Sequence, residues 1–405
     1  MQRALIALTL LAGSVSAQTV TFQYIPDGAV SANDMSPDGR YIVGGVDFNG
    51  DFIADQAYLW DRVSGVLELL PADVREAVAV SDDGQVVLGS MPDPDDEVQP
   101  IAEVAARWTA STGWVSLGYL PNALECPSRS NGYELSADGS VAVGLSWDGC
   151  SGRGFVWHEQ DGAMMQLQRL ASGGNRASVV SADGIVIAGF AQGTSGRTPA
   201  MWNGATGAGT LADPTGSLQG EFMGMNDDGS ILLGTVYTGG ADGVFDAVTW
   251  TAAGGMQRVG AGSLTVGWAG AAMDIDTAGT VVGFDYLLGN RRAWIKPAAA
   301  SNLVPLGDWA TSHGAAVPIA LLVAQAISND GRVICGHGGG TNSWILTVTP
   351  PCRADFDGDG FVSGIDFDLY VQAFEAGASS ADFDGDGFVT GIDFDLYVEA
   401  YEAGC

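Results

Sequence analysis

Acidic residues recur at alternate positions close to the C-terminus, within the twelve-residue segment 355–366. Carboxylates stand at positions 1, 3, 5 and 12 of this segment, and a glycine stands at position 6. This spacing wraps a calcium ion in oxygen ligands, with the backbone carbonyl of position 7 and with position 9, directly or through water. The predicted ligands of the first loop are Asp355, Asp357, Asp359, Phe361, Ser363 and Asp366.

The same loop recurs 27 residues further on, in register with the first. Its predicted ligands are Asp382, Asp384, Asp386, Phe388, Thr390 and Asp393. Each loop leads into apolar residues at helical spacing, so we expect a short amphipathic helix after each one. An acidic disordered tail is the alternative, but two copies with every ligand position filled favour a calcium module. Without metal its carboxylates would repel one another, so we expect its folding to depend on Ca²⁺.

Over residues 352–405 the two loops resemble type I dockerins, which are duplicated EF-hand-like modules whose loops end in Asp rather than Glu. The resemblance implies a small helical calcium-binding domain that docks to a cohesin-like domain or to another surface protein. Positions 10 and 11 of the loops are Gly364-Ile365 and Gly391-Ile392, where many dockerins carry a polar recognition pair. The near-identity of the two halves permits two symmetry-related docking poses.

A third acidic loop lies far from the first two, near the N-terminus. It follows the pattern Asp-x-Asn-x-Asp-x-x-x-Asp, although Phe52 stands where a glycine is usual. The candidate calcium ligands are Asp47, Asn49, Asp51, Ile53 and Asp55. An ordinary acidic surface loop is the alternative.

The elements that position this third loop belong to a repeat. A turn of the form Ser-x-Asp-Gly, or a weaker copy of it, occurs seven times at spacings of 45 to 55 residues. The turns begin at Ser36, Ser81, Ser136, Ser181, Asn226, Asp276 and Ser328. Asp-Gly between two β-rich runs predicts a hairpin, because glycine accepts the positive φ that such turns require.

Each turn is followed by a strand that ends at or near tryptophan and, in six units, by a Gly-led strand with leucines. Four antiparallel strands repeated seven times predict an all-β, seven-bladed propeller. The seventh unit lacks its fourth strand, and segment 19–26 is a spare strand that would complete it and close the ring. A right-handed β-solenoid is the alternative, but it does not explain this match.

The repeats also resemble the HAF-type extracellular repeats of bacterial exported proteins, in forms such as Gly154-Phe155-Val156-Trp157. The resemblance covers most of residues 19–348. It implies a propeller and export, and it implies no reaction.

The N-terminus carries a processing signal, with one basic residue, an apolar stretch and a small-residue cleavage site before Gln18. We therefore expect a signal peptide over 1–17, a propeller over 18–349, a dockerin-like domain over 350–405 and a secreted or surface-attached protein. The apolar stretch is too short to span a bilayer, and no other segment comes close.

Export permits disulfides among the five cysteines. In a hairpin, paired residues lie at equal distances along the chain from the turn. Cys126 and Cys150 are equally far from the turn near 137–138, so we expect them to lie opposite each other and to form a bridge. Cys352 and Cys405 bracket the C-terminal module and would clasp its ends. Cys335 lies in an apolar strand, which favours a buried thiol.

Composition excludes several functions. The net charge of −32 argues against nucleic acid and anionic membranes as partners. The sequence holds three histidines, and we find no nucleotide-binding loop, zinc motif or cofactor fingerprint in it, so we assign no catalytic residue.

Two functional hypotheses follow. In the first, the propeller is a non-catalytic binding or assembly module for a glycan or protein ligand, and the C-terminal module attaches it to a partner. The alternative is a polysaccharide-degrading enzyme, a glycoside hydrolase or lyase, with its active site on the propeller rim. We favour the first, because the repeats are regular and no acid–base constellation stands out.

Overall fold

The structure is a computed structural model, and it describes most of the chain. The described residues are 18–93, 103–121, 128–148, 151–193, 196–237, 245–260, 270–287, 290–338, 342–350, 352–357 and 361–404. The predicted signal peptide therefore lies outside them. Thr21–Thr347 forms one compact unit, and the chain from Val348 onward belongs to a second one.

The first unit is a seven-bladed β-propeller, as the repeat predicts, and each blade is a four-stranded antiparallel sheet. The strands of each blade follow one another outward from the innermost. Blade 1 consists of β2 (Asp34–Met35), β3 (Tyr41–Val46), β4 (Gln56–Asp61) and β5 (Val66–Leu69). Blade 2 consists of β6 (Ala77–Val80), β7 (Val87–Pro92), β8 (Glu103–Thr109) and β9 (Gly113–Gly118). Blade 3 consists of β10 (Ser130–Leu135), β11 (Val141–Asp148), β12 (Ser151–His158) and β13 (Ala163–Gln166). Blade 4 consists of β14 (Asn175–Val180), β15 (Val186–Gly193), β16 (Gly196–Asn203) and β17 (Gly209–Leu211).

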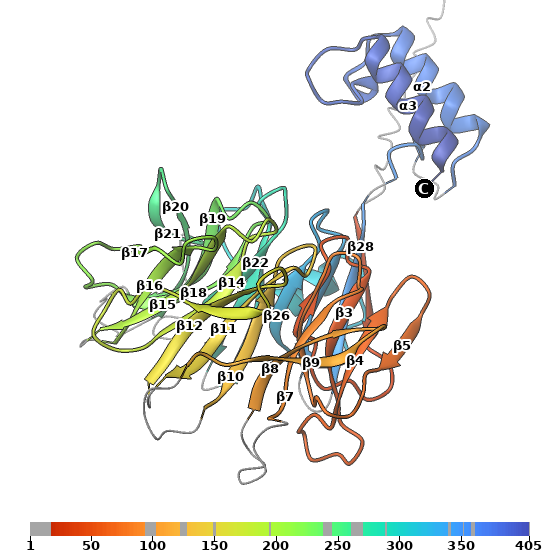
Figure 1. Cartoon of the computed structure of the whole chain (residues 1–405). Coiled ribbons are helices and arrows are strands. Elements are labelled where there is room, and N and C mark those ends of the chain that lie inside the picture. Colours follow the sequence, from red (N-terminus) through yellow and green to blue (C-terminus); the bar gives the residue numbers. More distant parts are fainter. Residues whose placement is uncertain are drawn as a thin grey trace, which may run out of the picture. The chain divides into compact units, whose positions relative to one another are not determined.

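The remaining blades use the same order until the last strand of the ring. Blade 5 consists of β18 (Gln219–Met225), β19 (Ile231–Tyr237), β20 (Phe245–Thr251) and β21 (Gly255–Arg258). Blade 6 consists of β22 (Ala271–Ile275), β23 (Val281–Leu287), β24 (Asn290–Lys296) and β25 (Val304–Pro305). Blade 7 consists of β26 (Leu321–Ile327), β27 (Val333–Gly338), β28 (Ser343–Thr349) and, outermost, the N-terminal β1 (Thr19–Tyr24). The predicted closure by the spare strand is confirmed, and Figure 1 shows blade 1 beside β28.

The repeated turn is held by its own serine and aspartate. In blade 3 the Ser136 hydroxyl donates to Asp138 Oδ1 at 2.8 Å and accepts from the Val141 N–H at 3.0 Å. Gly139 takes the positive φ of +67° that the turn requires. The serine is buried, so it satisfies a buried backbone donor that would otherwise have no partner.

The turns also join neighbouring blades. The Ala137 N–H donates to the carbonyl of Ala182 in the next turn at 3.0 Å, and the Ala182 N–H donates to Asp227 at 2.8 Å. A Cβ atom on Gly139 would lie 2.6 Å from Val86 of the preceding blade. The glycine is therefore required both by the turn and by the packing between blades.

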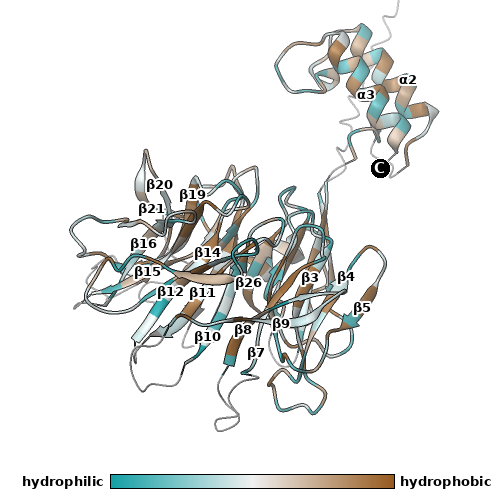
Figure 2. Cartoon of the chain, viewed as in Figure 1, coloured by the Kyte–Doolittle hydropathy of each residue, from teal (hydrophilic) through white to brown (hydrophobic). Residues whose placement is uncertain are grey.

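The hydrophobic core lies between successive blades. Trp294 and Trp344, from the third strands of blades 6 and 7, have no exposed surface, and Ile42 and Leu88 of the second strands are equally buried. Figure 2 shows the corresponding hydrophobic stretches along β3 and β19. Alternating apolar residues on both faces of each blade thus fill the space between sheets.

One element of the propeller is absent from the sequence-based prediction. Helix α1 (Leu306–Ser312) follows the two-residue strand β25 and leads toward blade 7. Leu306 and Ala310 anchor its buried side. The helix has only seven residues, which is too short for a helical period to stand out from sequence.

The second unit contains the two expected helices, α2 (Gly364–Glu375) and α3 (Gly391–Ala403), with a short 3₁₀ helix, Ser379–Ala381, between them. The rings of Tyr370 and Tyr397 stack at a centroid distance of 3.6 Å and are fully buried. Equivalent residues of the two halves therefore meet at the centre of the unit.

Candidate metal-binding loops and an acidic channel

The structure brings three carboxylates of each C-terminal loop together. In the first loop, one oxygen each of Asp355, Asp357 and Asp366 lies within 4.8 Å of the others. In the second loop the equivalent residues, Asp382, Asp384 and Asp393, meet the same limit. Three carboxylate oxygens at this spacing suit a hard divalent cation, so these residues could bind a metal.

Hydrogen bonds within the second loop fix its carboxylates. Asp382 accepts from the backbone N–H of Gly385 at 2.8 Å and of Gly387 at 2.9 Å. Both glycines have positive φ, +78° and +91°, which folds the loop around the aspartate. The loop is therefore curled, with its acids facing one another.

The last acid of each loop also begins the following helix. Thr390 and Ser363 are the N-caps of α3 and α2, and Asp393 and Asp366 complete a capping box with them. Asp393 accepts from the Thr390 N–H at 2.7 Å and from the Phe383 N–H at 2.7 Å. Helix and loop thus share one carboxylate.

These hydrogen bonds keep the shared carboxylates ionised. Backbone hydrogen bonds from Thr390 and Asp384, above all, lower the pKa of Asp393 to about 2. For Asp366, burial raises the pKa, but hydrogen bonds from Asp357 and Ser363 outweigh it and the pKa is lowered. An ionised carboxylate is the form that a cation requires.

Besides the two N-cap residues, four predicted ligands of the C-terminal loops are not members of these three-carboxylate clusters. Asp359 lies outside the described residues. Asp386 is exposed and accepts from the Phe388 N–H at 2.8 Å. The position 7 side chains, Phe361 and Phe388, are 74% and 70% exposed, which leaves only their carbonyls to serve a cation.

The loop near the N-terminus adopts the same hydrogen-bonding pattern as the second C-terminal loop. Asp47 accepts from the N–H groups three and five residues later, at Gly50 (2.7 Å) and Phe52 (2.8 Å), as Asp382 does. The Phe48 N–H donates to Asp55 at 2.8 Å, as the Phe383 N–H does to Asp393.

The remaining predicted ligands of this loop follow the pattern too. Asn49 accepts from the Asp51 N–H, and Asp51 accepts from the Ile53 N–H, both at 2.9 Å. Phe52 holds a φ of +70° where the C-terminal loop has glycine. The loop therefore keeps the curled shape despite a residue that rarely adopts this backbone.

The predicted disulfides fall largely outside what the structure describes. Cys126, Cys150 and Cys405 are not among the described residues. Cys335 is free and buried in β27, as its apolar surroundings suggest, whereas Cys352 is not free. Both bridges remain predictions.

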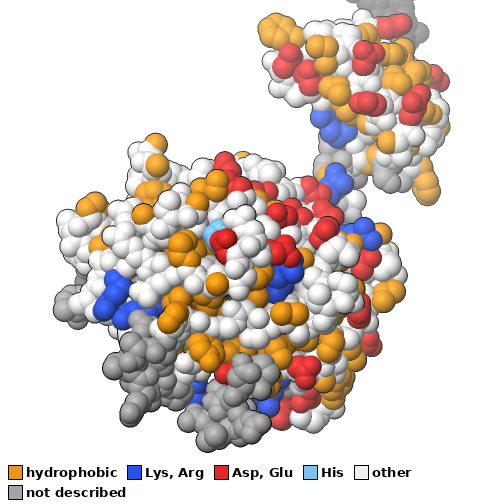
Figure 3. Space-filling view, viewed as in Figure 1, with side chains coloured by type: hydrophobic (Ala, Val, Ile, Leu, Met, Phe, Trp, Pro, Cys, Tyr) orange, Lys and Arg blue, Asp and Glu red, His pale blue; other side chains and the backbone are white. Residues whose placement is uncertain are grey.

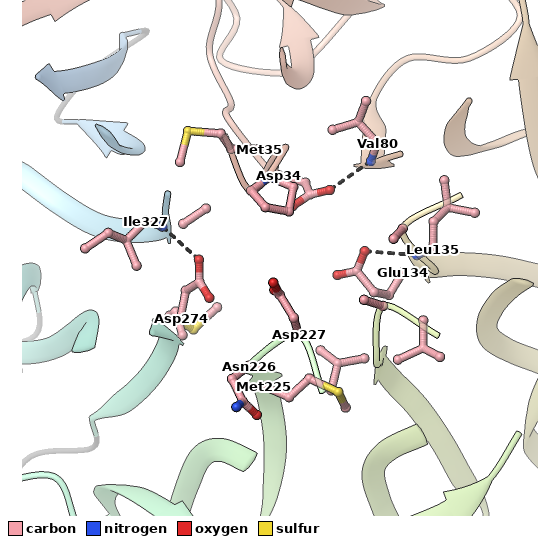
Figure 4. Close-up of a pocket in the computed structure, with 18 of the residues that line it drawn as sticks. Asp34, Met35, Val80, Glu134, Leu135, Met225, Asn226, Asp227, Asp274 and Ile327 are labelled. Carbon is pink, nitrogen blue, oxygen red and sulfur yellow. Dashed lines mark hydrogen bonds between the residues drawn. The ribbon is translucent and has the colours of Figure 1, made fainter. Parts of the chain in front are cut away.

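A second gathering of acids lies in the channel of the propeller, and sequence reasoning missed it. Asp34, Glu134 and Asp274 point toward one another across a cavity of about 150 Å³, with Asp227 beside them (Figure 4). The first three each stand two residues before the repeated turn of their blade. That shared position was the signal available in the sequence.

The surface of the C-terminal unit combines acidic and apolar side chains (Figure 3). Ile365 and Ile392, at position 11 of the loops, are exposed together with Phe361 and Phe388. Among the described residues, no helix is long and apolar enough to cross a membrane.

The fold and the clusters define this protein as a seven-bladed β-propeller joined to a small helical unit that could bind metal. No protein-family model matches the chain, and no curated protein matches it. Among solved structures, an oligogalacturonate lyase in complex with manganese aligns at 12% identity over 84% of this chain and 98% of its own, with a TM-score of 0.53.

Two further structures align at similar levels. An oligogalacturonate lyase from Vibrio parahaemolyticus has 10% identity over 83% of this chain and 98% of its own, with a TM-score of 0.52. The β-propeller domain of the Trilobed protease from Pyrococcus furiosus has 8% identity over 82% and 96%, with a TM-score of 0.51. At these identities the likeness concerns the fold alone.

The chain spans about half the length of two other solved structures that it matches. It covers 52% of TolB from Acinetobacter baumannii, with a TM-score of 0.40, and 42% of a prolyl endopeptidase, with a TM-score of 0.48.

Proposed function

We propose that this is a secreted or surface-attached calcium-binding protein, in which the propeller acts as a non-catalytic binding or assembly module. The C-terminal unit, over 350–405, is a dockerin-like attachment domain, and the propeller over 18–349 consists of HAF-type repeats. The observation that carries the proposal is the pair of three-carboxylate clusters in the C-terminal loops. The processing signal over 1–17 supports export.

Calcium is the metal that best suits these loops. Their donors are carboxylate and carbonyl oxygens, with no sulfur or imidazole among the predicted ligands, which favours a hard cation. Bound Ca²⁺ would neutralise carboxylates that otherwise repel one another. In an oxidising medium, a Cys352–Cys405 bridge would clasp the ends of the domain, and Cys126–Cys150 would staple blade 3.

The partner of the attachment domain is a cohesin-like or other surface protein with apolar pockets in a basic surround. Residues 352–405 contain thirteen acids and one arginine, so a basic surface complements them. The exposed Phe361 and Ile365, repeated as Phe388 and Ile392, supply apolar anchors in both halves.

The propeller loop at 47–55 is a third calcium site in this proposal. Its support is the hydrogen-bonding pattern that it shares with the second C-terminal loop, including the paired donors to Asp47 and Asp382. The ligands would be Asp47, Asn49, Asp51, Ile53 and Asp55.

A polysaccharide-degrading enzyme is the alternative, and it would require an acid pair in a cleft that admits a sugar chain. The inner acids Asp34, Glu134 and Asp274 line a cavity of about 150 Å³, below the roughly 300–1,000 Å³ that is usual for ligand sites. An adjoining pocket of about 450 Å³ has Asp38, Asp82 and Asp330 in its wall, so activity, not pocket size, separates the two hypotheses. Release of reducing ends from any polysaccharide by the purified chain would favour the enzyme instead.

Calcium titration of the mature chain by isothermal calorimetry tests the proposal. We expect three bound ions, and one fewer in each of Asp366→Asn, Asp393→Asn and Asp47→Asn, because each variant loses a charged ligand. Asp395→Asn removes an exposed acid of α3 two residues beyond a loop and is the matched control.

Near-ultraviolet circular dichroism of tyrosine provides a second readout for the C-terminal unit. All eleven tryptophans lie between Trp60 and Trp344, so tyrosine, and not the phenylalanines that outnumber it in this core, is the strongest near-ultraviolet chromophore of the unit. We expect its signal to grow as calcium is added. No heat of binding, or variants that bind as many ions as the unaltered chain, would contradict the proposal.

A further inference from the structure

The inner strands of the propeller turn their free edges toward the channel. Backbone N–H groups on these edges have no neighbouring strand to accept their hydrogen bonds. Asp34 Oδ2 accepts from the Val80 N–H of the next blade at 2.8 Å, and Asp274 Oδ2 accepts from the Ile327 N–H of the next blade at 2.8 Å. These carboxyl groups therefore tie blade 1 to blade 2 and blade 6 to blade 7.

Glu134 is the third acid at this level of the channel. It accepts from the Leu135 N–H at 2.9 Å. A β-bulge between Gly132 and Glu134, and another between Ala272 and Asp274, redirect these side chains from the ladder toward the cavity. In Figure 4 all three carboxyl groups face the same space.

The described residues that line the cavity supply no positive charge to balance these acids. No lysine, arginine or histidine is among the described residues that line it. The other titratable side chains that line it are Asp82 and Asp227, both exposed, and Asp227 reaches toward the space between the three acids (Figure 4). The thiol of Cys335 is buried in β27, and the charges of Asp34 and Asp274 contribute to its raised pKa. The side chains of Asp34, Glu134 and Asp274 are half-buried, with some of their surface open to the channel. Three carboxylates around so small a space still cannot all ionise without mutual repulsion and a partial desolvation penalty.

We propose that the carboxyl groups of Asp34, Glu134 and Asp274 form a pH-sensitive cluster at the inner strands, called the lock below, in which protonated carboxyl groups link the blades. The lock stabilises the propeller in mildly acidic medium, and its contribution decreases as the pH rises through neutrality. Protonated, each group keeps a carbonyl oxygen for its backbone donor and gains an O–H donor for its neighbours. Ionised, the three groups repel one another across the cavity.

The pKa values support this arrangement. Burial, above all, raises the pKa of Asp34 to about 7 and that of Asp274 to about 8, from an ordinary 3.8. Burial, followed by the charge of Asp34, raises the pKa of Glu134 well above its usual range. Burial and the charge of Asp227 also raise the pKa of Asp82.

The direction of the pH effect follows from proton linkage. A folded pKa above the unfolded value means that the folded chain holds more protons between the two values. The stability that these groups contribute is therefore fully present below an ordinary pKa of 3.8 and is lost as the pH rises through about 7 and 8.

Thermal unfolding of the full mature chain, measured from pH 5 to pH 8.5 at constant calcium, tests the lock. Tryptophan fluorescence reports the propeller alone, because the C-terminal unit has no tryptophan. We expect the unfolding midpoint of the unaltered chain to fall with rising pH. Asp274→Asn retains the acceptor for Ile327 without a charge, so its midpoint should exceed the unaltered one at pH 8 by at least about 2 °C.

Matched variants separate the lock from general charge effects. Asp73→Asn removes an exposed acid from the connection between β5 and β6, and it should leave the pH profile unchanged. Asp34→Asn should flatten the profile as Asp274→Asn does. A midpoint that does not fall between pH 5 and pH 8.5, or variants with the unaltered profile, would overturn the proposal.

Infrared spectroscopy of the unaltered chain decides the matter if a variant fails to fold. The carbonyl stretch of protonated carboxylic acids should be present at pH 7 and should vanish at higher pH. Its absence at pH 7 would overturn the proposal. The proposal would also be overturned if EDTA abolished the difference in unfolding midpoint between the unaltered chain and Asp274→Asn. That result would mean that a bound cation, and not a proton, occupies the cavity.

Discussion

At the scale of the residue, single side chains in this protein serve two neighbours at once. Ser136 closes its own turn by accepting from Val141 and also orients Asp138. Asp393 completes the capping box of α3 and is one of the three acids of a candidate metal cluster. Substituting such a residue therefore costs more than its own contacts suggest, because a buried donor loses its partner.

Ser136→Ala tests this reasoning. The substitution leaves the buried N–H of Val141 without its acceptor, so we expect a loss of about 1–3 kcal/mol in the free energy of unfolding. Urea unfolding followed by tryptophan fluorescence measures it. Ser172→Ala, at an exposed serine in the connection between β13 and β14, should change the free energy by less than about 0.5 kcal/mol. Equal effects of the two variants would contradict this role.

At the scale of the element, the repeated turn is both a hairpin and a contact between blades. Gly139, Gly184 and Gly229 each hold positive φ and each pack against a valine of the preceding blade. Gly162 turns between β12 and β13 with a φ of +63°, but a Cβ atom there would meet nothing within 4 Å. Comparing the two kinds of glycine separates backbone strain from packing.

Gly139→Ala should destabilise the propeller more than Gly162→Ala. Both variants pay for a left-handed backbone, roughly 1–2 kcal/mol. Only Gly139→Ala adds an overpacked contact, with Val86 at 2.6 Å, and this adds typically 1–3 kcal/mol. Thermal and urea unfolding measure the difference. If the two variants are equally stable, the turn does not transmit packing between blades.

At the scale of the whole molecule, the ring depends on a strand from the opposite end of the chain. β1 is the outermost strand of blade 7, and the Ile25 N–H, just beyond it, donates to Ser343 at 3.0 Å. This pairing covers the edge of β28 and joins the beginning of the propeller to its end. Closure is therefore a property of the chain as a whole.

Deleting Thr19–Tyr24 should lower the unfolding midpoint of the propeller by at least about 5 °C and promote aggregation through the exposed edge of β28. A synthetic peptide of residues 18–26, added to the deleted chain, should restore the midpoint. The same peptide carrying Val20→Asp should not, because Val20 is buried. A deleted chain that melts like the intact one would show that β1 does not close the ring.

Much of the architecture was readable from the sequence because local chemistry repeats. The turn at Ser136 and its six counterparts, the tryptophan strands and the spare strand predicted seven closed blades, and α2 and α3 follow their loops as expected. The ligand spacing predicted acids that the structure gathers into two clusters. Helix α1 escaped prediction because its seven residues carry too little periodicity.

The sequence by itself determined what depends on near neighbours, which are hairpins, caps and loops whose residues meet within a few positions of one another. Only the tertiary structure decided which distant side chains share a space. Asp34 and Asp274 lie 240 positions apart, and they face one cavity because closure of the ring brings blades 1 and 6 around a common axis. Their raised pKa values follow from the desolvation that this shared space imposes on half-buried side chains, which no local pattern encodes.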